Sequence, residues 1–184
     1  MKFTKTEFKD LLVIEPIVHR DSRGYFFESY HKQGLEAADI YCSFVQDNEA
    51  FSRYGAIRGF HYQLPPYEQD KLVRVIEGEV LDAVVDIRPH SPTYGQCFSI
   101  ILSAENKKQL FVPAGFAHAY ATLSETAIFS YKCSQYYSLE HEAGIDSNDP
   151  ALNIDWKIPK AERLISQKDS CLPKFGDHLL WPEN

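Results

Sequence analysis

Short apolar runs, rich in valine, isoleucine and aromatic residues, recur along most of the chain. Segments with turn-forming residues, such as DSRG, LPPYEQD and RPHSPTYG, separate them. Short strands at such regular spacing are typical of a β-sandwich or β-barrel, so the pattern predicts an all-β fold. The runs are LLVIEPIV, YFFESY, AIRGFHYQ, KLVRVIEGEVLDAVVDI, CFSIIL, QLFVP, FAHAYATL and TAIFSYKC.

Few segments favour a helix. We expect one helix from His31 to Asp39, and helical or irregular pieces in SLEHEAG and PKAERLIS. From about Asn148 onward the chain has the pattern of loop and extension. No repeat, low-complexity tract or linker rich in glycine and serine divides the sequence, so we predict one domain over residues 1–184.

Strand alternation places several polar side chains on apolar faces. In KLVRVIE, Lys71 shares a face with two valines. Asp82, His118 and Tyr131 likewise share a face with apolar neighbours on their own strands. A barrel would bring such side chains into one lumen, which is a common way to build a site for a small ligand.

Composition narrows the classes of function. Lysine and arginine number 19 against 26 aspartates and glutamates, a net charge of -7, whereas binding of nucleic acid needs a basic face. No apolar run approaches the roughly 20 residues of a membrane span, and the N-terminus lacks the apolar core of a signal peptide. We therefore expect a cytoplasmic protein that binds neither nucleic acid nor membrane. The four cysteines have no metal-binding or disulfide spacing, and we expect reduced thiols at Cys42, Cys97, Cys133 and Cys171.

Arg58 and His61 lie three positions apart in AIRGFHYQ. Strict alternation sends their side chains to opposite faces, but a bulge at Gly59 would re-aim one of them. The plainer interpretation is an edge strand with a solvated arginine and a hydrogen-bonded histidine.

The string PAGFAH, residues 113–118, matches the PxGxxH pattern of the second cupin motif, in which a turn delivers a histidine into a small β-barrel. The first cupin motif supplies HxH and a downstream acid for a metal, but the corresponding place here is His61-Tyr62-Gln63. His61, His118 and Glu68 would form only a weak ligand set, so we predict no functional metal.

Three further segments have two interpretations each. Tyr131, Tyr136 and Tyr137 are either aromatic core and rim, or a proton donor and a plate for a planar ligand. The turn in RDSRGYFFE, residues 20–28, is either a charged hairpin or a phosphate site. SQKD, residues 166–169, is either a surface loop or part of a similar site.

Several strings follow one another in order between about Lys9 and about Pro173: DSRGYFFES, FVQDNEAFS, IRGFHYQLPP, KLVRVIEGEVLDAVVDIRPHSPTYG, LSAENKKQLFVPAGFAHAY, YKCSQYY, NDPALNIDW and LISQKD. Their joint order and spacing resemble the dTDP-4-dehydrorhamnose 3,5-epimerase family of the cupin superfamily. The resemblance implies a jelly-roll (cupin) β-barrel with a few short peripheral helices.

The resemblance also implies a reaction. These enzymes act on a 4-keto-6-deoxyhexose attached to dTDP, whose C4 ketone acidifies the C–H bonds at C3 and C5. By resemblance His61 is the base, Asp169 orients it, and Tyr131 is the proton donor on the opposite face. Lys71 would stabilise charge on the C4 oxygen, as in an oxyanion hole. Histidine, with an ordinary pKa of about 6.5, suits a base at neutrality, and tyrosine, with an ordinary pKa of about 10, stays protonated. Neither a metal nor a redox cofactor is required.

The mode of substrate binding follows from the same resemblance. His118 and Arg58 match positions that line the sugar and phosphate site, and Tyr137 matches the residue that stacks on thymine. The other matching nucleotide positions are Arg23, Glu28, Gln46, Asp47, Asn48, Glu142 and Lys168. In this family the N-terminal segment that carries Arg23 and Glu28 reaches into the partner's site, which implies a homodimer with composite active sites.

The chain departs from the family pattern at three places. FAHAY replaces the usual FAHGF, QDK replaces QGK, and Ser138-Leu139 follow the tyrosine pair where serine or alanine with proline is common. No catalytic group is lost, so we predict conversion of dTDP-4-dehydro-6-deoxy-D-glucose to dTDP-4-dehydro-L-rhamnose, in the biosynthesis of dTDP-L-rhamnose. The alternatives are a C3-only epimerase of another dTDP-4-keto-deoxysugar and a non-catalytic cupin that binds a sugar nucleotide or a metal.

Overall fold

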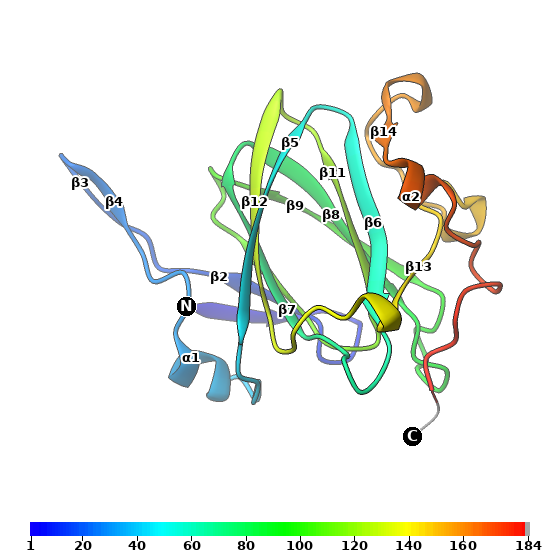
Figure 1. The fold of residues 1–184 in the computed structure, drawn as a ribbon. Coiled ribbons are helices and arrows are strands. Elements are labelled where there is room, and N and C mark those ends of the chain that lie inside the picture. The colour runs from blue at the N-terminus through cyan, green and yellow to red at the C-terminus, as the bar shows by residue number, and fades with distance from the viewer. Residues whose placement is uncertain (183–184) are drawn as a thin grey trace.

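Two antiparallel sheets form the body of the protein in a computed structural model, which describes residues 1–182 (Figure 1). The first sheet has the strand order β1 (Lys2–Lys5), β2 (Leu12–Glu15), β10 (Gln109–Val112), β7 (Lys71–Glu77), β12 (Thr126–Cys133) and β5 (Gln46–Arg53). The second has the order β13 (Glu142–Gly144), β6 (Ala56–Gln63), β11 (Phe116–Thr122), β8 (Glu79–Asp86) and β9 (Cys97–Ser103). The sheets pack face to face as a jelly-roll barrel, which confirms the all-β prediction.

The remaining elements are short and peripheral. A hairpin of β3 (His19–Asp21) and β4 (Gly24–Phe26) extends away from the barrel (Figure 1). Strand β14 (Leu164–Ile165) pairs in parallel with β6. The helices are α1 (Lys32–Glu36), α2 (Gln167–Ser170) and the 3₁₀ turns Leu139–His141, Pro150–Leu152 and Lys160–Glu162. None of the helices within residues 1–182 is long and apolar enough to cross a membrane.

Three apolar clusters follow the alternation that the sequence predicts. Val73, Phe129 and Tyr120 belong to the cluster between the sheets. Ala117 and Ala119, from the opposite side of β11, pack instead against the segment that follows β13. A third cluster lies on the outer face of the first sheet, where α1 covers it. The inward faces of β7, β11 and β12 are therefore the ones predicted.

The structure corrects two predictions of local structure. The helix expected from His31 to Asp39 is shorter and ends at Glu36. Asp39 has a left-handed φ of 64°, a conformation that an α-helix does not contain. His31 caps it, since its Nδ1 accepts a hydrogen bond from the Gly34 amide at 3.2 Å. Strands β1 and β5 were absent from the predicted runs, because both are polar edge strands whose outward side chains are exposed.

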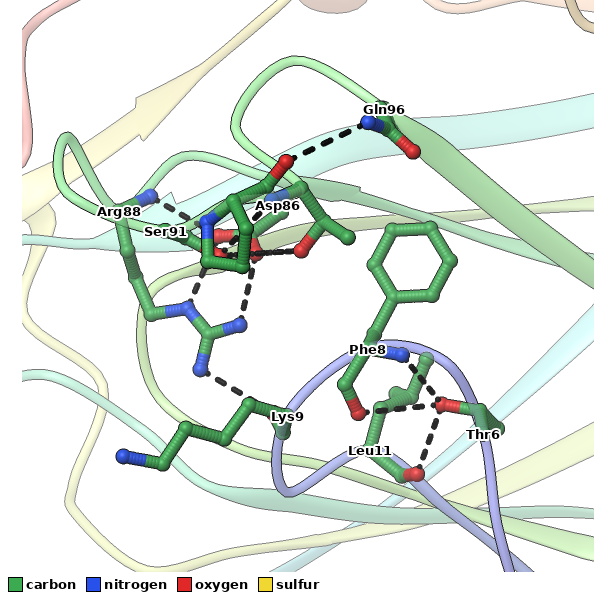
Figure 2. Close-up of polar contacts among 10 residues, drawn as sticks. Thr6, Phe8, Lys9, Leu11, Asp86, Arg88, Ser91 and Gln96 are labelled. Atoms are coloured by element: carbon green, nitrogen blue, oxygen red, sulfur yellow. Dashed lines mark hydrogen bonds and ion pairs between the residues drawn. The ribbon is translucent and has the colours of Figure 1, made fainter.

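A buried carboxylate ties the loop after β8 to the start of the chain (Figure 2). Asp86 accepts hydrogen bonds from Arg88 Nη2 at 2.7 Å and from the hydroxyls of Ser91 and Thr93 at 2.6 Å. Burial raises the pKa of Asp86, but these hydrogen bonds outweigh it and hold the pKa below its usual value. Arg88 Nη1 in turn donates to the carbonyl of Lys9 at 3.2 Å, which fixes the loop against the N-terminal segment.

The segment after Asn148 does more than the predicted loop and extension. It crosses the outer face of the second sheet, where Trp156 is buried and donates to the carbonyl of Ser147 at 2.8 Å. The chain then returns to β6 through β14 and α2. This return brings Asp169, which is buried, to the open side of the barrel.

Candidate active site

A cavity of about 700 Å³ opens between the two sheets, with the returning segment on one side. Seven of the predicted site residues line it: Arg58, His61, Lys71, His118, Tyr131, Lys168 and Asp169. A hollow of about 100 Å³ shares His61, Lys71 and Tyr131 with this cavity. The predicted residues that line only this hollow are Gln46, Asn48, Tyr137 and Glu142.

A bulge in β6 aims two of these side chains into the same cavity. His61 pairs with His118 and Arg58 pairs with Tyr120, so three steps on β6 oppose two steps on β11. Gly59 lies in the bulge with a φ of 110°, and a Cβ there would meet the carbonyl oxygen of His118. The bulge considered from the sequence is therefore confirmed, and it brings Arg58 and His61 together.

His61 and Asp169 form a close pair at the cavity wall. His61 Nε2 lies 2.7 Å from Asp169 Oδ1. Burial raises the pKa of Asp169, but hydrogen bonds from His61, Gly59 and Ser166 outweigh it and lower the pKa below its usual value. An ionised carboxylate only accepts hydrogen bonds, so Nε2 carries the proton of the neutral imidazole and Nδ1 keeps a lone pair.

Lys71 and Tyr131 lie on neighbouring strands of the opposite sheet. Burial lowers the pKa of Lys71, although Cys133, Glu142 and Asp82 raise it in part. Within residues 1–182 its Nζ forms no ion pair, and it lines the cavity, so it is available to a ligand. Burial raises the pKa of Tyr131 to about 12, which keeps the phenol protonated at neutral pH.

A second imidazole–carboxylate pair lies deeper in the barrel. His118 Nε2 is 2.8 Å from Asp82 Oδ2, and the imidazole stacks against Phe129 with ring centroids 6.0 Å apart. Asp82 is fully buried, and among residues 1–182 its other oxygen, Oδ1, has no hydrogen-bond partner. Burial therefore raises the pKa of Asp82, against the opposing effects of His118 and Lys71.

The smaller hollow is bordered by a cluster around Glu142. Its Oε2 accepts hydrogen bonds from Tyr137 Oη at 2.7 Å and from Lys168 Nζ at 2.6 Å. Gln46 Oε1 accepts from the backbone amide of Tyr137 at 3.0 Å, and Gln46 Nε2 donates to Asn48 at 3.0 Å. An aromatic ring and an ammonium are thus held at the edge of the same hollow.

Three predicted residues lie away from this site in the monomer. Arg23 is in the hairpin, where it pairs with Asp21 at 2.6 Å. Glu28 is exposed in the segment after the hairpin. Asp47 lies on the opposite face of β5 from Gln46 and bonds Lys132 Nζ at 2.7 Å.

Some residues of the site were not identified from the sequence. Arg163 lines the cavity, but it lies in a segment whose sequence pattern gave no sign of a site. Asp82 was noticed only as a charged residue on an apolar face, and Tyr120 only as a neighbour of His118. Ser52 does not line the cavity but bonds Arg58, and no role was assigned to it although it ends the string FVQDNEAFS. Within residues 1–182 no three His, Cys, Asp or Glu side chains gather closely enough to hold a metal ion.

Comparison with known proteins agrees with this geometry. A family model described as dTDP-4-dehydrorhamnose 3,5-epimerase matches residues 5–177. The Shigella flexneri protein of that name is 48% identical over 178 residues, which cover 96% of this chain and 97% of the relative.

Solved structures are similar over almost the whole fold. The dTDP-4-dehydrorhamnose 3,5-epimerase from Elizabethkingia anophelis has a TM-score of 0.92 at 49% identity, covering 96% of this chain and 97% of its own. A 3,5-epimerase from Legionella pneumophila, solved with dTDP-4-keto-L-rhamnose, has a TM-score of 0.91 at 43% identity, covering 96% and 93%. On these matches, together with the cavity that seven of the predicted residues line, the chain belongs to the dTDP-4-dehydrorhamnose 3,5-epimerase family.

Proposed function

We propose that this protein epimerises C3 and C5 of dTDP-4-dehydro-6-deoxy-D-glucose to give dTDP-4-dehydro-L-rhamnose. The observation that carries the proposal is the convergence of His61, Lys71 and Tyr131 on one cavity from three strands, with Asp169 behind the histidine. This set combines a base, a cation and a proton donor, which is the set that proton exchange beside a ketone requires.

The first step removes a proton from the carbon next to the ketone. The C–H bond breaks, its proton goes to Nδ1 of His61, and the electron pair moves onto the C4 oxygen as an enolate. Asp169 assists because it holds the Nε2 proton and stabilises the imidazolium that forms. Lys71 stabilises the enolate oxygen, since its ammonium has no competing ion pair within the described chain.

The second step returns a proton from the other face. The Tyr131 hydroxyl gives its proton to the carbon, and the enolate collapses to the ketone with the centre inverted. The high pKa of Tyr131 keeps this proton in place at neutral pH until the carbanionic carbon is there to accept it. His61 returns its proton to solvent and Tyr131 regains one, so the enzyme ends the cycle unchanged.

For the nucleotide we propose that the Glu142 cluster forms the thymidine end of the site. Tyr137 supplies a ring face for thymine, and Lys168 and Arg58 supply positive charge for the diphosphate. Gln46 and Asn48 supply amide donors and acceptors beside the base. Asp47 pairs with Lys132 on the outer face of β5, and we assign it no direct contact with the nucleotide.

A homodimer completes the site in this proposal. The hairpin that carries Arg23 extends away from the barrel of its own chain, and the Arg23 side chain is 88% exposed (Figure 1). Phe26, in the same hairpin, is 67% exposed, and exposure of a large apolar side chain to water is unfavourable unless a partner covers it. We infer that the hairpin places Arg23, with Glu28, at the diphosphate of the second copy. A cytoplasmic location stays a prediction.

Incubation with the dTDP-4-keto sugar in heavy water tests the reaction. We expect deuterium at both C3 and C5, because each centre exchanges its proton with groups that equilibrate with solvent. Deuterium at C3 alone would support the C3-only alternative. Folded protein that binds dTDP but incorporates no deuterium would overturn both enzymatic readings in favour of a binding protein.

Mixing two inactive variants tests the composite site. An Arg23→Ala dimer and a His61→Ala dimer each lack one group at every site. After subunit exchange, each heterodimer has one site with both groups intact, so we expect about a quarter of wild-type activity from random mixing. Mixtures as inactive as their parents, with exchange of subunits verified by mass, would refute the shared site.

A further inference from the structure

Three side chains from three strands form a polar network in the wall of the cavity. Arg58 Nε donates to Ser52 Oγ at 3.0 Å, and Ser52 Oγ lies 3.1 Å from Tyr120 Oη. The residues come from β6, β5 and β11, so the network joins the two sheets. The reaction described above gives no role to Ser52 or Tyr120.

The network fixes the direction of the Arg58 guanidinium. Nε bonds Ser52, and Nη2 donates to the carbonyl of Phe51 at 3.2 Å. Two anchors on one edge of a planar group define its orientation. The third nitrogen, Nη1, has no hydrogen-bond partner within residues 1–182, so its two protons remain for a ligand in the cavity that Arg58 lines.

The other end of the network is rigid. Ser52 and Tyr120 are 3% and 4% exposed, so neither hydroxyl exchanges freely with water. The Tyr120 ring stacks on Phe129 with centroids 4.1 Å apart and planes at 14°. A fixed phenol thus holds the serine hydroxyl, and the serine oxygen holds Arg58.

We propose that Ser52 and Tyr120 are positioning residues for substrate binding, which hold Arg58 so that Nη1 meets the diphosphate of the sugar nucleotide. The inference rests on the proposed function, because that function supplies the anion. Tyr120 is also the last residue of FAHAY, where the usual FAHGF ends in phenylalanine, so its hydroxyl adds an anchor beyond the common pattern.

Two single substitutions test the proposal by titration with dTDP. Ser52→Ala removes the acceptor of Nε, and we expect dTDP affinity to fall about tenfold. Tyr120→Phe keeps the stacked ring and removes only the hydroxyl, so we expect a fall of about threefold. KM for the substrate should rise in parallel while kcat at saturation stays unchanged, because the proposal gives neither residue a part in proton transfer.

Matched controls come from the same residue types elsewhere. Ser99→Ala changes an exposed serine in β9, and Tyr94→Phe changes a tyrosine that packs on Phe175 outside the cavity. Both should bind dTDP as the wild type does. Ser52→Ala or Tyr120→Phe with wild-type affinity, or with a lower kcat and an unchanged KM, would overturn the inference.

A double-mutant cycle separates positioning from a general structural effect. Once Arg58→Ala has removed the guanidinium, Ser52→Ala should cause no further loss of dTDP affinity. An equal loss of dTDP affinity in both backgrounds would show that Ser52 acts on the fold. That result would overturn this inference and leave the proposed function intact. Wild-type protein that binds no dTDP would overturn the proposed function first and this inference with it.

Discussion

The site contains the same chemical pair twice, in two different surroundings. His61–Asp169 and His118–Asp82 have nearly equal separations, 2.7 and 2.8 Å. The His61 side chain is 31% exposed to the cavity, whereas that of His118 is 9% exposed. The two carboxylates differ more, because within the described part of the chain Asp169 receives several hydrogen bonds and Asp82 receives one.

This difference gives the two acids net pKa shifts in opposite directions. Burial raises both pKa values, but the hydrogen bonds to Asp169 outweigh it, and those to Asp82 do not. Asp169 is therefore a stable anion beside a histidine with an open edge, which suits repeated proton transfer. Asp82 bonds His118 through Oδ2, while its Oδ1 is unpaired among the described residues, so its task is to fix His118 in one orientation. Identical partners thus perform different tasks.

The largest expected effect separates the two histidines. His61→Ala removes the base, and we expect deuterium exchange to fall about 10²–10⁴-fold while dTDP binding is largely retained. His118→Ala should reduce exchange far less and weaken substrate binding instead, because the His118 side chain lines the cavity but is only 9% exposed, against 31% for His61. Both are measured by exchange in heavy water and by titration with dTDP. Normal exchange in the His61 variant would refute the base assignment.

The next effect separates the two aspartates. Asp169→Asn removes the anion that holds the Nε2 proton and stabilises the imidazolium, so we expect kcat to fall about 10²-fold. Asp82→Asn keeps an acceptor for His118 and removes a poorly solvated charge, so kcat should fall less than about tenfold. Thermal unfolding provides the second readout, since only Asp82→Asn should leave the melting temperature unchanged or higher. Equal losses of kcat would remove the distinction drawn between the pairs.

The two pairs also show which features of the site can be predicted from local sequence patterns. Strand alternation is local, so it predicts that Lys71, His118 and Tyr131 face inward, and the structure agrees. The bulge at Gly59 has a local signal as well, because a glycine inside a strand pattern suggests a bulge. Asp169 is different, since it lies 108 residues from His61 and reaches it only after the chain has crossed the second sheet. Only the family resemblance connected these two residues.

Other features depend on packing that no local pattern records. Asp82 stood out as a charge in an apolar strand, but its partner His118 follows from the pairing of β8 with β11. Ser52 lies in a polar edge strand whose sequence pattern is similar to that of a loop. Only its pairing with β12 along its full length shows that the segment is a strand. The expected helix after His31 was overestimated, because propensity does not show where one residue takes a positive φ.

The smallest effect is a shift in the pH profile, and it follows from the position of Asp82 near Lys71. Burial lowers the pKa of Lys71, and the charge of Asp82 raises it in part. Lys71 stabilises the enolate only while protonated, so kcat/KM should fall as pH rises through its pKa, below the range where Tyr131 ionises near about 12. Asp82→Asn removes a supporting negative charge and should move this alkaline limb to lower pH.

Asp169→Asn is the matched control, because Asp169 does not contribute to the pKa of Lys71. The alkaline limb of the Asp169→Asn variant should therefore stay in place. A limb that moves upward, or that moves equally in both variants, would show that another group controls it.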